Sequence, residues 1–144
     1  RSGSIRAAEW SEIDWVRKVW DVPADHMKEK EFHRVPLSSG AIATLKQIPR
    51  QAGTNLIFPN SKGASLSDNT LSSLMRRHEV NGVPHGFRAS FSTWCAMETD
   101  YQTELREAAL AHKVQNMVIE AYQRSDLLEK RRSLMEDWST RISP

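Results

Sequence analysis

The sequence predicts a mainly α-helical protein with one small antiparallel β-sheet, an α+β fold. Apolar residues recur at helical spacing over most of the chain after residue 38. The stretch from residue 13 to residue 37 is instead rich in β-branched and aromatic residues. The length of 144 residues suits one compact domain, and neither a repeat nor a Gly/Ser/Pro-rich linker divides the chain. We therefore expect a single domain over residues 1–144.

The N-terminal third is predicted to hold a short helix followed by the sheet. Ser2-Gly3-Ser4 precedes good helix formers and predicts a helix start. Strands are expected within residues 15–22 and 32–37, with a polar turn at residues 25–30 between them. Pro36 lacks a backbone N–H, so it is expected at the edge or the end of the sheet.

Helices are predicted over most of the remaining chain, with residues 56–59 as a short strand or extended segment. Ser38-Ser39 can cap the first of these helices, which Pro49 ends. Ser67 or Asp68 can cap the second. The expected apolar positions, helix by helix, are Ile42, Leu45 and Ile48; Leu71, Leu74 and Met75; Phe87, Phe91 and Trp94; Leu105, Ala108 and Ala109; Val118, Ala121 and Tyr122; and Leu127, Leu134, Trp138 and Ile142.

Composition and charge exclude several classes of protein. No apolar run approaches the ~20 residues that a membrane helix needs. Cys95 is the single cysteine, which excludes an internal disulfide and a multi-thiolate zinc site and suits a reducing compartment. Twenty Lys and Arg against eighteen Asp and Glu give a formal charge of +2, so the net charge neither requires nor excludes a polyanionic partner.

Four polar residues near predicted helix ends are candidates for chemistry. His85 begins a predicted helix, and Arg88 lies one turn further on the same face. The two residues can be a helix cap with a surface pair. They can also form an anion site, supported by the free N–H groups of the helix start. His112 follows a small apolar stretch, and Tyr122 lies ten residues later on a predicted helix. Taken alone, Tyr122 can equally be a core tyrosine with a solvated hydroxyl.

Together these segments resemble the tyrosine recombinase (phage integrase) family in order and spacing. Residues 85–91 contain the His-x-x-Arg motif, residues 109–113 contain Leu-Ala-His, and Tyr122 follows about one helix later. Arg1-Ser2-Gly3 is similar to the first arginine motif of prophage and genomic-island integrases. Residues 20–38 are similar to the hairpin of that subgroup, which places its catalytic lysine at Lys28. Ser4 departs from the pattern, because the subgroup has Glu there to support the first arginine.

The resemblance implies the chemistry of DNA strand cleavage and rejoining. Arg1 and Arg88 would bind the non-bridging oxygens of a DNA phosphate, and His112 would donate a hydrogen bond to one of them. Tyr122 would be the nucleophile that forms a 3′-phosphotyrosyl link, helped by His85 as proton acceptor. Lys28 would protonate the leaving 5′-oxygen.

The resemblance also implies partners and requirements. The expected partner is double-stranded DNA at attachment sites, bound by a homotetramer, and we expect no metal, ATP or other cofactor. The carboxylates form no spaced cluster that would hold Mg²⁺, and no arginine stands where a cysteine phosphatase built on Cys95 would need it. Further basic residues are either DNA-backbone contacts or solvated surface charges: Lys30, Arg34, Lys62, Arg76 and Arg77.

The organisation implied is a catalytic domain cut from a longer integrase, without its N-terminal DNA-binding domains, acting in the bacterial cytoplasm near the nucleoid. The stripe from Leu127 to Ile142 can cover the domain's own core or dock on a neighbouring protomer, and residues 130–132 are expected to face away from the DNA. A type IB topoisomerase shares most of this residue set. The alternative that is not an enzyme is a DNA-binding module that has kept this fold without catalysis.

Overall fold

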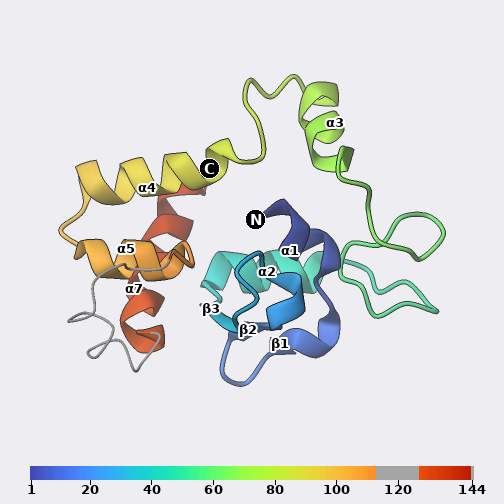
Figure 1. Cartoon of the computed structure of the whole chain (residues 1–144), viewed down its shortest axis with the longest axis horizontal. Coiled ribbons are helices and arrows are strands. Elements are labelled where there is room, and N and C mark those ends of the chain that lie inside the picture. Colours follow the sequence, from blue (N-terminus) through green and yellow to red (C-terminus); the bar gives the residue numbers. More distant parts are fainter. Residues whose placement is uncertain (113–126, 144) are drawn as a thin grey trace.

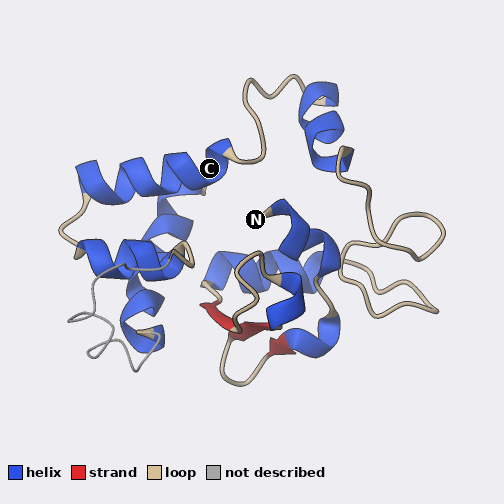
Figure 2. Ribbon diagram, in the orientation of Figure 1, coloured by secondary structure: helices blue, strands red, loops and turns tan. Residues whose placement is uncertain are grey.

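The computed structural model describes residues 1–112 and 127–143. It has two halves side by side, shown in Figure 1. One half holds the sheet with helices α1 and α2, and the other holds helices α4, α5 and α7. Helix α3 lies apart from both, at the end of long loops that are tan in Figure 2. The mainly helical class with one small antiparallel sheet is confirmed.

The sheet has three antiparallel strands in the order β1-β2-β3. They are β1 (Ile13–Asp14), β2 (Val19–Val22) and β3 (His33–Pro36). Pro36 pairs with Val19 at the end of an edge strand, where its missing N–H costs no ladder bond. The prediction of a strand through residues 15 and 16 was wrong. The Asp14 carboxylate accepts hydrogen bonds from the backbone N–H of Val16 and Arg17, at 3.0 and 2.8 Å, and turns the chain there.

A helix precedes the sheet and another follows it, as predicted. Helix α1 (Ser2–Ala7) precedes it, and helix α2 (Ser39–Gln47) follows it. The Ser38 hydroxyl accepts the N–H of Ala41 and caps α2. Short 3₁₀ helices at Trp10–Glu12 and Ala24–His26 connect the elements.

A small apolar core joins α1, the sheet and residues 55–58. It contains Ala8, Trp10, Ile13 and Ile57. The backbone N–H of Ile57 donates to the carbonyl oxygen of Ala8 at 2.8 Å, so the predicted extended segment is tied to the end of α1. The segment forms isolated antiparallel bridges, such as that between Leu56 and Glu9, and not a continuous strand.

The second core lies among α4 (Gly86–Glu98), α5 (Thr103–Ala109) and α7 (Leu128–Ile142). Trp138 packs against the rings of Phe91 and Trp94, with centroids 5.5 and 5.0 Å apart. Phe87 was predicted on the inner side of α4, but its side chain is 62% exposed. It lies in the first turn of α4, beyond the part of the helix that α5 and α7 cover. The remaining buried members are Cys95, Leu105, Leu110 and Leu134.

Helix α7 connects the two halves, because it packs against α5, α2 and β3. Leu134 is fully buried, while Ile142 is 60% exposed, so most of the predicted stripe covers the protein's own core. Within residues 130–132, Arg131 is buried at 1% exposure and Lys130 is exposed. Helix α3 (Thr70–Arg77) has no buried residue, and its N-cap is Asn69 rather than Ser67 or Asp68.

The helix predicted around Val118, Ala121 and Tyr122 lies outside the described residues. Within the described ranges, no helix has the length and apolarity that crossing a membrane requires.

Candidate active site

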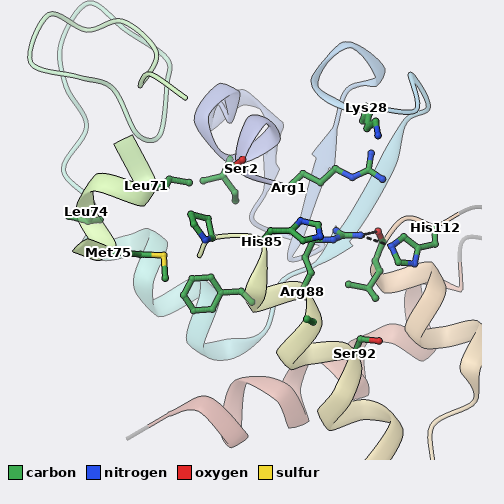
Figure 3. Close-up of a pocket in the computed structure, with 15 residues that line it drawn as sticks. Arg1, Ser2, Lys28, Leu71, Leu74, Met75, His85, Arg88, Ser92 and His112 are labelled. Carbon is green, nitrogen blue, oxygen red and sulfur yellow. Dashed lines mark hydrogen bonds between the residues drawn. The ribbon is translucent and has the colours of Figure 1, made fainter. Parts of the chain in front are cut away.

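A cleft of about 940 Å³ lies where α1, α3, the start of α4 and the end of α5 approach one another. Five of the six residues predicted to be catalytic line it: Arg1, Lys28, His85, Arg88 and His112. Figure 3 shows these five side chains together at one end of the cleft, with Leu71, Leu74 and Met75 at the other. They come from parts of the chain more than 100 residues apart. Tyr122 lies outside the described residues.

Arg88 and His112 are in direct contact. The Nη2 of Arg88 lies 2.9 Å from the Nε2 of His112, and the same Nη2 donates to the carbonyl oxygen of Leu110 at 2.6 Å (Figure 3). Burial, followed by the positive charge of Arg1, lowers the pKa of the Arg88 guanidinium, whereas Glu107 raises it. Arginine remains charged in proteins, so two guanidinium groups face one cleft at a cost that an anion would relieve.

The end of α5 positions His112. The helix ends at Ala109, and Ala111 then adopts a left-handed conformation with φ 52°. The N–H of Ala111 donates to the Ala108 carbonyl oxygen, and the N–H of His112 donates to that of Glu107. These two bonds form a Schellman motif, the usual C-terminal cap with a left-handed residue.

The Schellman motif brings two side chains together. The Nδ1 of His112 lies 2.7 Å from Oε2 of Glu107, and Oε1 of Glu107 accepts a hydrogen bond from Nε of Arg106 at 3.2 Å. Burial alone would raise the pKa of the Glu107 carboxyl, but the bonds with His112 and Arg106 outweigh burial, and this pKa is lowered.

Arg1 is the N-cap residue of α1, and its Nη1 donates to Oε1 of Glu29 at 3.2 Å. Glu29 is next to Lys28 on the segment between β2 and β3, so this ion pair ties Arg1 to the segment that carries Lys28. Ser4, which stands where the subgroup has Glu, is buried and donates to the backbone oxygen of His26 at 2.7 Å. Ser4 therefore fixes α1 against the segment that leads to Lys28.

His85 is the N-cap residue of α4, and its side chain is exposed. The expected anion site of free helix N–H groups is only partly present. The N–H of Gly86 donates to Val83 at 2.8 Å and that of Arg88 to His85 at 3.1 Å. The positive charge of the cleft thus comes mainly from side chains.

The residues predicted to contact the DNA backbone do not line the cleft. Arg76 and Arg77 are exposed on the last turn of α3, and Lys62 is exposed on the preceding loop. Lys30 is exposed near Lys28, and Arg34 lies on the edge strand β3. Over the ranges that the structure describes, no three His, Cys, Asp or Glu side chains group to hold a metal ion.

Sequence reasoning missed Glu107 and Glu29, the two acidic partners of the cleft. Glu107 precedes His112 by five residues, which is the spacing of the two ends of a Schellman motif. That signal could have been found from the Leu-Ala-His ending of a helix. The contact of Glu29 with Arg1 crosses 28 residues and carries no local signal.

Two arginines, two histidines and a lysine line this one cleft, which defines a positively charged site whose hydrogen-bond donors suit a phosphate group. Residues 1–129 match the Phage integrase family, and the chain belongs to this family.

Several curated proteins are similar to the chain. Prophage integrase IntA of Escherichia coli (strain K12) is 38% identical over 144 residues, covering 96% of this chain and 35% of that protein. The integrase of Enterobacteria phage P4 is 32% identical, with 96% of this chain and 36% of that protein covered. The integrase of Shigella phage Sf6 is 27% identical, with 96% and 37% covered. The chain thus spans about a third of the length of these relatives. No solved structure matches the chain significantly.

Proposed function

We propose that this chain is the catalytic domain of a site-specific DNA recombinase that integrates or excises prophage or genomic-island DNA. The observation that carries the proposal is the cleft in which Arg1, Lys28, His85, Arg88 and His112 meet. Residues this polar and this distant in sequence gather around a common ligand, and a phosphodiester matches their charge. The names of the relatives, which are integrases of phages and of E. coli prophages, agree with this activity.

Binding of the scissile phosphate is assigned to Arg1, Arg88 and His112. Attack on phosphorus places additional negative charge on the non-bridging oxygens, and fixed cationic donors stabilise that charge. Arg88 already has one donor engaged with Leu110, which holds its guanidinium at the cleft wall.

Bond breaking is assigned to Tyr122. Its phenolic oxygen forms a bond to phosphorus as the bond to the 5′-oxygen breaks, which gives a 3′-phosphotyrosyl link. The phenolic proton passes to His85, and the 5′-oxygen receives a proton from Lys28. The covalent link conserves the phosphodiester energy, so the 5′-hydroxyl of a second strand can reverse the step. Cleavage and rejoining by this route need neither electron transfer nor nucleotide hydrolysis.

A nicked suicide substrate tests the proposal, because loss of the short cleaved product traps the covalent adduct. We expect Tyr122→Phe to abolish the adduct while DNA affinity stays nearly unchanged, since only the nucleophilic oxygen is removed. The measurement is adduct formation on a denaturing gel beside a DNA-binding titration. An adduct formed by Tyr122→Phe would show that the nucleophile is misassigned.

Tyr101→Phe is the matched control, because the described residues contain this one other tyrosine. The Tyr101 hydroxyl donates to Oδ2 of Asp137 at 2.6 Å, and burial together with that bond raises its pKa to about 12. Such a phenol is a poor nucleophile at neutral pH. We expect Tyr101→Phe to form the adduct as the unchanged chain does. No adduct from the unchanged chain would favour a catalytically silent DNA-binding module.

The proposed partner is double-stranded DNA at attachment sites within bacterial nucleoids, bound by four protomers. The exposed end of α7 at Ile142 is the surface we assign to contact with a neighbouring protomer. A relaxation assay on supercoiled DNA, compared with recombination of paired sites, separates this function from a topoisomerase activity.

A further inference from the structure

His112 is held at both ring nitrogens by charged groups. The Arg88 guanidinium contacts Nε2 and the Glu107 carboxylate contacts Nδ1, at 2.9 and 2.7 Å. A guanidinium only donates, so Nε2 accepts from Arg88 and the ring proton is on Nδ1, donated to Glu107. In this arrangement His112 has no proton on Nε2 to offer to a phosphate oxygen.

Binding of a phosphate changes this balance. When the donors of Arg88 turn to phosphate oxygens, Nε2 is released and can take up a proton. The neighbouring positive charge of Arg88 opposes that second proton, whereas the Glu107 carboxylate favours it by continuing to accept from Nδ1. The other titratable or charged groups that line the cleft are cations or a second imidazole: Arg1, Lys28 and His85.

Glu107 is itself fixed in place. Its backbone oxygen accepts the N–H of His112 in the Schellman motif, and Arg106 holds the second carboxylate oxygen. The lowered pKa of Glu107 keeps this carboxyl charged at neutral pH. Backbone and side chain of one residue therefore define both the place and the orientation of the imidazole.

We propose that Glu107 is a positioning residue that orients His112 and keeps its imidazole able to donate from Nε2 to the scissile phosphate. The inference rests on the proposed function, because it assigns Glu107 a part in the same phosphate chemistry. Glu107 acts through His112 and does not touch the DNA.

Two substitutions separate charge from position. Glu107→Gln keeps a hydrogen-bond acceptor near Nδ1 but removes the negative charge. As the pH rises, the cleavage rate of this variant should therefore begin to fall at a lower pH than that of the unchanged chain. At acidic pH the two rates should be nearly equal. Glu107→Ala removes both, so cleavage should fall by about 10–100-fold, the loss typical of groups that orient a metal-binding histidine, with a deficit that persists at acidic pH. Glu104→Gln, on the same helix with the same charge change, is the control and should behave as the unchanged chain.

The first measurement needs no DNA. Nitrogen resonances of the His112 ring are followed against pH in the unchanged chain, Glu107→Gln and Glu104→Gln. We expect ring protonation to move to lower pH in Glu107→Gln alone. Identical titrations in all three proteins would overturn the proposal, whatever the cleavage results.

The second measurement is single-turnover cleavage of the nicked substrate against pH. Equal rates for Glu107→Gln, Glu107→Ala and the unchanged chain at every pH would also overturn the proposal. Absence of cleavage by the unchanged chain would contradict the proposed function instead, and the ring titration would then still decide whether Glu107 controls His112.

Discussion

One nitrogen of Arg88, Nη2, bonds both the Leu110 carbonyl oxygen and His112. Replacing Arg88 with alanine removes the donor that we assign to the phosphate and also the bond to Leu110 at the end of α5. We expect Arg88→Ala to slow adduct formation by about 10²–10³-fold, the usual loss for one charge-stabilising donor. Single-turnover cleavage of the nicked substrate measures this.

Arg88→Lys provides the companion variant. Lysine keeps the charge but presents a single ammonium group, which cannot reach Leu110, His112 and a phosphate oxygen together. Its rate should recover only partly. A loss below tenfold for Arg88→Ala would contradict the assigned phosphate contact.

At the scale of single elements, the end of α5 depends on a left-handed alanine. Ala111 has φ 52°, a conformation that glycine adopts freely and β-branched residues adopt poorly. We expect Ala111→Val to lower the free energy of unfolding by about 1–2 kcal/mol. In Ala111→Gly the free energy of unfolding should stay the same or rise slightly, because the relief of backbone strain offsets the larger entropy of the unfolded chain. Urea unfolding followed by tryptophan fluorescence measures both variants.

One exposed carboxylate on α7 bonds to the first residue of α2. Glu136 accepts the backbone N–H of Ser39 at 2.9 Å and also bonds the Ser39 hydroxyl, and these bonds lower the pKa of Glu136. A carboxyl whose pKa is lower in the folded state stabilises that state above about pH 4.3, the unfolded value. The contribution is lost as the pH falls through the folded value.

Glu136→Gln should therefore be less stable than the unchanged chain at pH 7 and nearly equal to it at pH 3. Urea midpoints at the two pH values give the comparison. Glu79→Gln, an exposed carboxyl with the same charge change, controls for net charge. A difference that stays constant between pH 7 and pH 3 would contradict the role given to the Glu136 carboxylate.

Local signals predicted most elements, whereas long-range packing decided the exceptions. The Ser38 cap and the edge position of Pro36 follow from the chemistry of single residues, and both are confirmed. The exposure of Phe87 and the burial of Arg131 depend on which neighbours cover each helix, so the periodicity of either helix alone could not predict them.

The candidate site was predicted through its motifs, and its geometry required the fold. The resemblance named the residues, and five of them line one cleft. The ion pair of Arg1 with Glu29 and the fixing of α1 by Ser4 join segments that no sequence pattern connects.

At the scale of the whole molecule, DNA affinity should depend on basic residues outside the cleft. Arg76 and Arg77 are exposed at the end of α3. Each phosphate contact adds about one unit to the slope of log affinity against log salt. We expect the double replacement by alanine to reduce that slope by about two and to weaken binding to all sequences alike. Binding titrations from 50 to about 200 mM salt provide the measurement.

Lys130→Ala is the control for this prediction, because Lys130 is exposed on α7, the helix that packs against α2, α5 and β3. Its salt slope should equal that of the unchanged chain. An equal reduction in both variants would mean that the affinity reflects net charge rather than contacts at the end of α3.

The isolation of α3 has a consequence for its local stability. A helix of eight residues with no buried side chain has little to hold it, since helices shorter than about 12 residues are marginal in water. Its amide hydrogens should therefore exchange with solvent far faster than those of α4, whose inner face is packed. Because Leu71, Leu74 and Met75 also line the cleft, a duplex seated there would slow this exchange, and α3 would report occupancy of the cleft before any bond is broken.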